Sequence, residues 1–457
     1  MSHQDANARD VAVQALLDRG GNVTAHIDRF AGSGAPAAEK GLARELALGV
    51  LRRRATLDAV LRAFLRQADR RPPGPVQEIL QVALYQVLFL DRIPDFAAVS
   101  EAVVQTGRLG HIRQGKFVNG VLRGITRELW AAEEGLPPAA DVIPISARAG
   151  RRIGRAVFPL PEKDPGGYLA AAYSLPQSLA ARWVARWGGL AGALPVAAQA
   201  AARAPLLVRP NTLKGSVDDI LAALRQEGAQ AQWHADGRCI VLEGVPNVQQ
   251  MAALRTGLIQ PQDATAAAVA PACGVTPDMN VLDFCAAPGT KTTHLAQLMA
   301  NRGRIVALDV SAEKLSRIDD SCRRMGISIV KTMLAGFAAQ LPEASFDVAL
   351  VDAPCSNTGV FARRAEARWR CDPKSLAVLA ADQQVLAAMA ARFVRPGGRL
   401  VYSTCSIEPE ECGLLALTLA RKNPRLELLR DELTLPAGAD DPVHWRDGGY
   451  TAIFGVR

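Results

Sequence analysis

Residues 346–356 read FDVALVDAPCS, and residues 399–406 read RLVYSTCS. Each stretch is a short apolar run, rich in β-branched residues, with a cysteine just past its end: Cys355 in the first and Cys405 in the second. Short apolar runs bounded by Pro, Ser and Gly predict buried strands of a parallel sheet. Ligands bind at the carboxyl ends of such strands. Two thiols delivered to that edge therefore indicate covalent chemistry rather than packing.

The sequence around these two strands alternates regularly between strands and helices. MNVLDFC, RIVALDV and ISIVKTM are further apolar runs, and TKTTHLAQLMANRG and SAEKLSRIDDSCRRMG lie between them as helical segments. A loop and a long helix around 373–394 separate the two cysteine-bearing strands, and RLELL and YTAIFGV predict a closing hairpin. This alternation predicts an α/β fold over residues 261–457, with a doubly wound and mostly parallel sheet.

Three regions precede that sheet. Residues 1–140 carry apolar positions at helical spacing, as in EILQVALYQVLFL, and predict an all-helical bundle. Residues 141–177 are rich in Pro and Gly with little periodicity, so we expect a linker. Residues 178–260 read as a helix followed by strand, helix and strand, which predicts a small α+β unit.

The net charge of +8 is spread unevenly over the 457 residues. Lys and Arg outnumber Asp and Glu by 18 to 15 over residues 1–140 and by 13 to 8 over 141–260, and the two kinds balance at 22 each over 261–457. This placement suits modules that hold a polyanion such as RNA for a neutral catalytic domain. A solvated basic surface explains it equally well.

The cysteines and histidines argue against a metal cluster or a disulfide framework. All eight cysteines lie from Cys239 onward without CxxC spacing, and the six histidines are scattered. The start of the chain lacks the pattern of a signal peptide, and no apolar run reaches the length of a membrane span. We therefore expect a cytoplasmic monomer that requires no metal and no membrane.

The first strand of the α/β region leads into DFCAAPGTKT, residues 283–292, which opens a helix. Small residues in such a turn let the backbone approach a ligand at the helix N-terminus. The fingerprint GxGxxG fails because only Gly289 is present, and a Walker A loop fails because Thr290 separates Gly289 from Lys291. The second strand ends at Asp309, where an acidic residue binds ribose hydroxyls in this kind of fold, although Asp-Val-Ser also suits a helix cap. A ligand with a ribose and no pyrophosphate is favoured, and S-adenosylmethionine fits.

Two thiols suit methyl transfer to carbon 5 of a pyrimidine. This carbon is a poor nucleophile until a thiolate adds to carbon 6, and a base must later remove the proton from carbon 5. The reaction needs a nucleophilic thiol, an acid near ring nitrogen 3 and a group that helps the final elimination. Asp352, Cys355 and Cys405 can fill these roles, and the residues alone do not rank the two cysteines. Either cysteine by itself reads as a packing thiol, but both at strand ends behind a cofactor-type turn favour chemistry.

CAAPGTK, DAPCSNTG and YSTCS occur in this order, and their combination resembles the signatures of the NOL1/NOP2/Sun family of RNA cytosine-5 methyltransferases. YQVLFLDRIPDFAAVSEAV and KFVNGVLR resemble the NusB-like RNA-binding domain of the bacterial Sun/Fmu branch. The resemblance covers most of the chain outside the linker. It implies a Rossmann-like methyltransferase sheet and methylation of a cytidine in 16S rRNA with S-adenosylmethionine.

The resemblance also implies residue roles. Cys405 is expected to be the nucleophile, Cys355 to assist release of the product, and Asp352 to contact the cofactor and the reacting centre. The other implied cofactor contacts are Cys285, Ala286, Ala287, Pro288, Gly289, Thr290, Lys291 and Asp309.

The chain departs from the family pattern in three places. Thr290 stands where the family has Gly, and no acidic residue follows ISIVKTM, which leaves the adenine contact unassigned. The segment 362–369, ARRAEARW, lacks the proline of the corresponding family loop. These departures bear on cofactor and RNA binding rather than on the type of reaction.

Basic residues interleaved with an aromatic follow Cys355. Such a loop suits phosphate contacts and base stacking, and a solvated loop is the alternative. Arg363, Arg364, Arg368 and Arg370 cluster there with Trp369, and the predicted RNA contacts are Arg363, Arg364, Arg368 and Trp369. Because a paired cytidine would first have to leave its stack, we expect an unpaired target. The alternatives are the same chemistry on tRNA or 23S rRNA, and a non-catalytic RNA-binding assembly factor.

Overall fold

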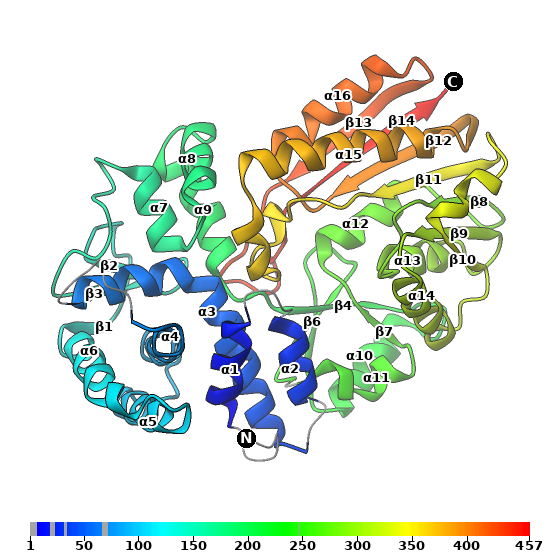
Figure 1. The fold of residues 1–457 in the computed structure, drawn as a ribbon. Helices are drawn as coiled ribbons and strands as arrows, with labels where there is room; N and C mark the ends of the chain where they lie inside the picture. The colour runs from blue at the N-terminus through cyan, green and yellow to red at the C-terminus, as the bar shows by residue number, and fades with distance from the viewer. Residues whose placement is uncertain (1–6, 19–22, 32–33, 66–71, 246) are drawn as a thin grey trace. The chain divides into compact units, whose positions relative to one another are not determined.

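The computed structural model describes residues 7–18, 23–31, 34–65, 72–245 and 247–457 (Figure 1). The chain divides into two compact units, Met1–Ala202 and Arg203–Arg457, and each is described by itself. Among the described residues, every helix is too short or too polar to span a membrane.

The first unit begins with a helical bundle. Its helices are α1 (Ala8–Leu17), α2 (Val23–Ala31), α3 (Ala37–Phe64), α4 (Gly74–Phe89), α5 (Asp95–Arg108) and α6 (Gly115–Arg127), with a short turn η1 (Ile112–Gln114) before α6. Helix α4 is apolar on most sides, and almost every residue from Val76 to Leu88 is buried. It packs against α1, α3, α5 and α6 and is the central helix of the bundle. The expected helical N-terminal bundle is confirmed for α1 to α6, whereas residues 129–134, within the range 1–140 that was predicted to be all-helical, form a strand.

The segment expected to be a linker carries regular structure, so that expectation is wrong. Strands β1 (Leu129–Glu134), β2 (Val142–Pro144) and β3 (Ala149–Ile153) form an antiparallel sheet in the order β1-β3-β2, and α7 (Pro165–Tyr173) follows. Polar contacts hold these short elements to α3: Arg53 Nη1 donates to the carbonyl oxygen of Pro144 at 2.9 Å, and Thr56 Oγ1 donates to that of Ala172 at 3.0 Å. Strands this short leave no periodic pattern in the sequence.

Two more helices, α8 (Gln177–Arg186) and α9 (Leu190–Ala201), pack against α7 and belong to the first unit. The expectation that α8 opens the α+β unit therefore differs from this division of the chain. Trp183 on α8 is fully buried, and the centroid of its ring lies 5.3 Å from that of Trp187.

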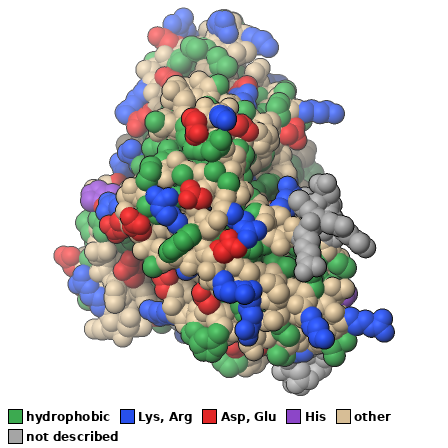
Figure 2. All heavy atoms as spheres, turned by 90° about the vertical axis from the view of Figure 1, so that its left-hand side faces the viewer, with side chains coloured by type: hydrophobic (Ala, Val, Ile, Leu, Met, Phe, Trp, Pro, Cys, Tyr) green, Lys and Arg blue, Asp and Glu red, His purple; other side chains and the backbone are tan. Residues whose placement is uncertain are grey.

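On the face shown in Figure 2, basic, acidic and apolar side chains are interspersed rather than gathered into patches of one charge.

The second unit begins with a small antiparallel sheet. Strands β4 (Leu206–Pro210), β5 (Gln230–Trp233), β6 (Ile240–Glu243) and β7 (Ile259–Pro261) lie in the order β5-β6-β4-β7, with α10 (Val217–Gln226), η2 (Val248–Gln250) and α11 (Ala252–Arg255). Buried Arg209 on β4 donates to Gln297 Oε1 at 2.7 Å and to Thr293 Oγ1 at 3.2 Å. These two acceptors belong to α13 (Thr290–Leu298), a helix of the α/β region, so the small sheet is tied to that region.

The main sheet has seven strands. They are β8 (Asn280–Asp283), β9 (Arg304–Asp309), β10 (Val330–Leu334), β11 (Phe346–Asp352), β12 (Val394–Thr404), β13 (Leu426–Thr434) and β14 (Gly449–Val456), in the order β10-β9-β8-β11-β12-β14-β13. The first five are parallel, and β13 and β14 form an antiparallel hairpin at one edge. The expected mostly parallel sheet with a closing hairpin is confirmed.

Helices cover both faces of this sheet (Figure 1). One face packs against α12 (Ala264–Ala272), α13 (Thr290–Leu298) and α14 (Ala312–Met325). The other packs against α15 (Pro373–Ala391) and α16 (Gly413–Lys422). Four short turns complete the unit: η3 (Ala335–Gln340), η4 (Thr358–Val360), η5 (Ala365–Arg370) and η6 (Pro409–Glu411). Successive side chains along the strands enter the cores on the two faces of the sheet in turn. Functional residues are therefore expected at the ends of the strands.

Candidate active site

The ends of β11 and β12 bring two thiols into contact. The strands are parallel neighbours, and Asp352 pairs in register with Ser403. Cys355 and Cys405 follow within three residues, and their sulfur atoms lie 2.8 Å apart. Both residues are partly exposed. One thiol donates its proton to the other, and a single substrate ring can reach both sulfurs.

Asn357 and Gly359 fix the turn that follows Cys355. Asn357 has φ of 63°, a left-handed conformation that Asn tolerates, and its Nδ2 donates to the carbonyl oxygen of Cys355 at 2.8 Å. The Gly359 N–H donates to the carbonyl oxygen of Cys405 at 3.0 Å. A Cβ at Gly359 would lie 2.5 Å from the carbonyl oxygen of Gly448. Glycine is therefore required for the two cysteine loops to touch.

A buried carboxylate supports the loop that carries Cys355. Glu411 is fully buried, and it accepts hydrogen bonds from the Ser356 N–H at 2.9 Å, from Gln383 Nε2 at 2.8 Å and from the Ser356 hydroxyl. Gln383 Nε2 also donates to the carbonyl oxygen of Pro354 at 2.7 Å. These donors offset the cost of burying the carboxylate. The residues on both sides of Cys355 are thus tied to one polar network.

The hydrogen bond between the thiols separates their pKa values. It lowers the pKa of Cys355 and raises that of Cys405 well above its ordinary value, because the Cys405 proton stabilises a thiolate on Cys355. The nearby charges act in the opposite sense: the Lys291 ammonium lowers the pKa of Cys405, and the Glu411 carboxylate raises that of Cys355. Once one thiol of the pair has lost its proton, the other thiol loses its proton less readily, since two negative charges would then lie on adjacent sulfurs.

Lys291 links the thiol pair to the turn at residues 285–291. Its Nζ lies 2.6 Å from Asp352 Oδ2. Burial lowers the pKa of Lys291, whereas the charge of Asp352 and its hydrogen bond raise it. The raising effects together are larger, so the net shift of the pKa is upward. Lys291 therefore keeps its ammonium form beside Asp352.

The 285–291 turn is short, and a hydrogen bond between the residues that flank it, Asp283 and Thr292, closes it. Helix α13 begins at Gly289, which has φ of 93° and whose added Cβ would lie 3.0 Å from Ile318 Cγ1. Thr292 Oγ1 donates to Asp283 Oδ2 at 2.7 Å. Burial raises the pKa of Asp283 to about 7, and its Oδ1 is a buried atom with no hydrogen-bond partner in the described part of the chain. This carboxyl group lies directly under the predicted cofactor turn.

Asp309 ends β9 next to an exposed apolar surface. Its Oδ1 accepts from the N–H of Ser311 at 3.1 Å, and Ser311 itself caps α14. In the parallel pair of β9 and β10, Asp309 lies opposite Leu334. Beyond these strand ends, Val310 is 82% exposed and Phe337 is 50% exposed. A helix N-terminus, a carboxylate and exposed apolar side chains together fit a nucleoside such as that of S-adenosylmethionine.

The basic loop after Cys355 divides into inward and outward side chains. Arg368 is fully buried, and its Nη2 donates to the carbonyl oxygen of Phe361 at 3.2 Å. Arg363 donates to Asp447 Oδ2 at 2.5 Å and to the carbonyl oxygen of Pro205 at 2.8 Å. Arg368 therefore has no exposed surface to offer RNA, whereas the Arg363 side chain is engaged in these internal contacts and is 28% exposed. Arg364 and Trp369 are exposed, as an RNA contact requires.

Sequence reasoning missed the supporting carboxylates. The motifs single out Asp283 only as the start of the turn, and they give no role to Glu411 or Gln383. The signal for Glu411 is the run IEPEE directly after the second cysteine motif. Acidic residues so close to an apolar strand end need partners or solvent. Among the described residues, no group of three or more His, Cys, Asp or Glu side chains is placed to hold a metal ion.

Three family models match parts of the chain. They are the 16S rRNA methyltransferase RsmB/F over residues 272–442, the NusB family over 6–127, and a ferredoxin-like domain of RsmF/B-like methyltransferases over 175–249. A Bacillus subtilis (strain 168) protein named probable ribosomal RNA small subunit methyltransferase B is 32% identical over 85% of this chain and 81% of that protein.

This chain belongs to the ribosomal RNA small subunit methyltransferase B family. Among solved structures, that of PH0851 matches with a TM-score of 0.73 and 23% identity over 97% of this chain and 98% of that one. NSun6 from Pyrococcus horikoshii, solved with SFG, matches with a TM-score of 0.55 and 20% identity over 62% of this chain and 98% of that one. Both likenesses show the fold. Family membership confirms the predicted resemblance and S-adenosylmethionine as the methyl donor.

Proposed function

We propose that this member of the family methylates carbon 5 of an unpaired cytidine in 16S rRNA through a covalent cysteine–cytosine adduct. The observation that carries the proposal is the pair of sulfurs of Cys355 and Cys405, 2.8 Å apart. Methylation of an exocyclic amine or a ribose hydroxyl needs no thiol. Two thiols at neighbouring strand ends, with Lys291 and Asp352 beside them, match the needs of carbon-5 chemistry.

Cys405 is the nucleophile in this proposal. As its sulfur adds to carbon 6 of the cytosine, the Cys405 proton passes to ring nitrogen 3, which the polar edge formed by Asp352 and Lys291 binds, and Cys355 remains the thiolate. The resulting enamine makes carbon 5 nucleophilic, and S-adenosylmethionine supplies an electrophilic methyl group. The Cys355 thiolate then accepts the proton from carbon 5, and the bond between Cys405 and carbon 6 breaks as ring nitrogen 3 returns its proton to Cys405. The family resemblance assigns this role to Cys405, and the Lys291 ammonium helps Cys405 to lose its proton because its charge opposes the hydrogen bond to Cys355 and the Asp352 carboxylate, which raise the pKa of Cys405.

The cofactor lies along the strand ends of β8 to β10 in the same proposal. Residues 285–291 approach it at the N-terminus of α13, and Asp309 binds the ribose hydroxyls. The exposed side chains of Val310 and Phe337 supply an apolar surface for the adenine in place of the missing third acidic residue. Asp283 supports the turn from beneath.

Methyl incorporation from labelled S-adenosylmethionine tests the proposal. Transcripts of 16S rRNA, 23S rRNA and tRNA are offered separately, and bisulfite sequencing locates any 5-methylcytidine. We expect incorporation into 16S rRNA alone, at an unpaired cytidine. Modification of tRNA or 23S rRNA instead would show that another RNA is the substrate. RNA binding without methyl incorporation would show that the protein is a non-catalytic assembly factor.

A further inference from the structure

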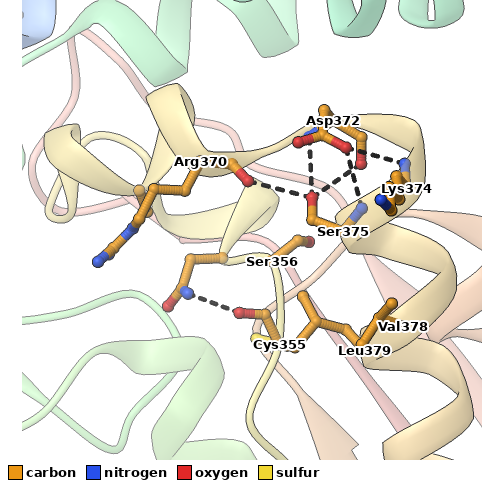
Figure 3. Close-up of a pocket in the computed structure, with 10 residues that line it drawn as sticks. Cys355, Ser356, Arg370, Asp372, Lys374, Ser375, Val378 and Leu379 are labelled. Carbon is orange, nitrogen blue, oxygen red and sulfur yellow. Dashed lines mark hydrogen bonds between the residues drawn. The ribbon is translucent and has the colours of Figure 1, made fainter.

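A cavity of about 490 Å³ opens beside Cys355 (Figure 3). It is formed by three segments: the 355–357 loop, the turn η5 and the first turns of α15. The ten lining residues are Cys355, Ser356, Asn357, Ala367, Arg370, Asp372, Lys374, Ser375, Val378 and Leu379. Its volume lies within the range of roughly 300–1,000 Å³ that is typical of sites for small organic groups.

The walls of the cavity combine an apolar surface with two cations. Val378 is 55% exposed, and Leu379 and Ala367 add further apolar surface. Arg370 and Lys374 are exposed and lie on opposite sides of the view in Figure 3. An apolar wall between cations is the arrangement that binds one nucleotide of a single strand, with the base on the wall and phosphates at the cations.

Asp372 is the acidic residue of the cavity wall, and it is occupied with the helix. Its Oδ1 accepts from the N–H groups of Lys374 and Ser375, each at 2.9 Å, in a capping box. Ser375 Oγ in turn donates to the carbonyl oxygen of Arg370 at 3.1 Å. These bonds tie the backbones of Arg370 and Lys374 together and leave both charged ends exposed. The two cations outnumber the one carboxylate, so the wall favours an anion.

The cavity borders Cys355 and none of the other methyl-transfer groups. Of the thiol pair, Cys355 alone is a lining residue, and the lining set includes neither Asp352 nor the 285–291 turn. A target base must contact Cys405, whose sulfur lies 2.8 Å from that of Cys355. When the target base contacts Cys405, the nucleotide next to it in the RNA is therefore placed to reach the cavity at Cys355.

We propose that this cavity binds the nucleotide adjacent to the target cytidine, with its base against Val378 and Leu379 and its phosphates at Arg370 and Lys374. The inference rests on the proposed function and names a second subsite for the same RNA. It adds two exposed cations, Arg370 and Lys374, to a loop in which Arg368 is buried and Arg363 is engaged in internal contacts.

A double variant, Arg370→Ala with Lys374→Ala, tests the subsite in the full-length protein with a 16S rRNA transcript. The KM for RNA should rise about tenfold, with a smaller change in kcat, because the lost contacts are to phosphates. The slope of log binding affinity against log salt concentration should fall in magnitude by about 2, since each phosphate contact contributes about 1. The matched control is Lys422→Ala, which removes an exposed cation at the end of α16.

A second variant, Val378→Asp, tests the apolar wall. It should raise the KM for RNA while the thermal unfolding midpoint stays at the wild-type value, because the side chain is largely exposed. If the double variant and Val378→Asp both match Lys422→Ala in KM and in salt dependence, the subsite is refuted. Failure of the proposed function looks different: the wild-type protein itself then shows no methyl incorporation into any RNA.

Discussion

The end of β11 and the end of β12 deliver the same functional group into different surroundings. Cys355 lies in a loop whose flanking residues are tied to Gln383 and the buried carboxylate of Glu411. Cys405 lies on the side of Lys291, which is paired with Asp352. The two motifs look alike in the sequence, yet Cys355 lies near the lone carboxylate of Glu411, whereas Cys405 lies near the ion pair of Asp352 and Lys291. The comparison teaches that the role of each cysteine is set by residues distant in the chain.

Replacing each cysteine in turn should give the largest effects and the sharpest contrast. Cys405→Ala removes the nucleophile, so methyl transfer should fall by at least roughly 10³-fold. Cys355→Ala leaves addition intact but slows elimination, so a covalent protein–RNA adduct should accumulate. Denaturing gel electrophoresis of the protein with labelled RNA measures the adduct. An adduct formed by Cys405→Ala and absent from Cys355→Ala would reverse the two roles.

Removing the cation on the Cys405 side should have the next largest effect. In Lys291→Met the pKa of Cys405 rises, because the ammonium that lowers it is lost. Turnover requires the thiolate, so the acidic limb of the pH–rate profile should move to higher pH. The rate at neutral pH should fall in proportion to the thiolate fraction, about tenfold if the limb moves by about one pH unit.

Lys291→Arg is the matched control because it keeps the charge, and its profile should stay close to that of the wild-type protein. Equal displacement of the acidic limb in both variants would show that Lys291 acts through packing instead. The binding of S-adenosylmethionine, measured separately, distinguishes a damaged cofactor turn from a changed thiol.

The smallest effect is expected from the carboxylate on the Cys355 side. Glu411→Gln keeps the shape of the side chain but turns part of an acceptor into a donor facing Ser356 and Gln383. The free energy of unfolding should fall by about 1–3 kcal/mol, the cost of leaving buried donors unsatisfied. The pKa of Cys355 should also fall, since the carboxylate raises it.

Chemical denaturation and the pH dependence of thiol alkylation measure these two changes. Glu432→Gln is the control, because Glu432 is exposed on β13. If Glu411→Gln and Glu432→Gln have the same stability and the same alkylation profile, Glu411 does not distinguish the two loops.

Much of the second unit was predictable because its signals are local. Apolar runs and helical periodicity located β8 to β12 and the helices between them, and the two closing runs gave the hairpin of β13 and β14. The small sheet β1–β3 was missed because β1 directly follows a helix and β2 and β3 are short and follow prolines. Its stability depends on contacts such as that of Arg53 with Pro144, and such contacts leave no pattern in the sequence.

The sequence by itself determined the α/β order and that two cysteines follow neighbouring parallel strands, because strand runs and cofactor turns are encoded in consecutive residues. Tertiary structure alone decided which arginines of the 363–370 loop are exposed. Arg368 is buried against Phe361 and Arg363 is paired with Asp447, whereas Arg370 and Lys374 border an open cavity. In a loop without periodicity, a side chain turns inward or outward according to the partners that distant segments place beside it.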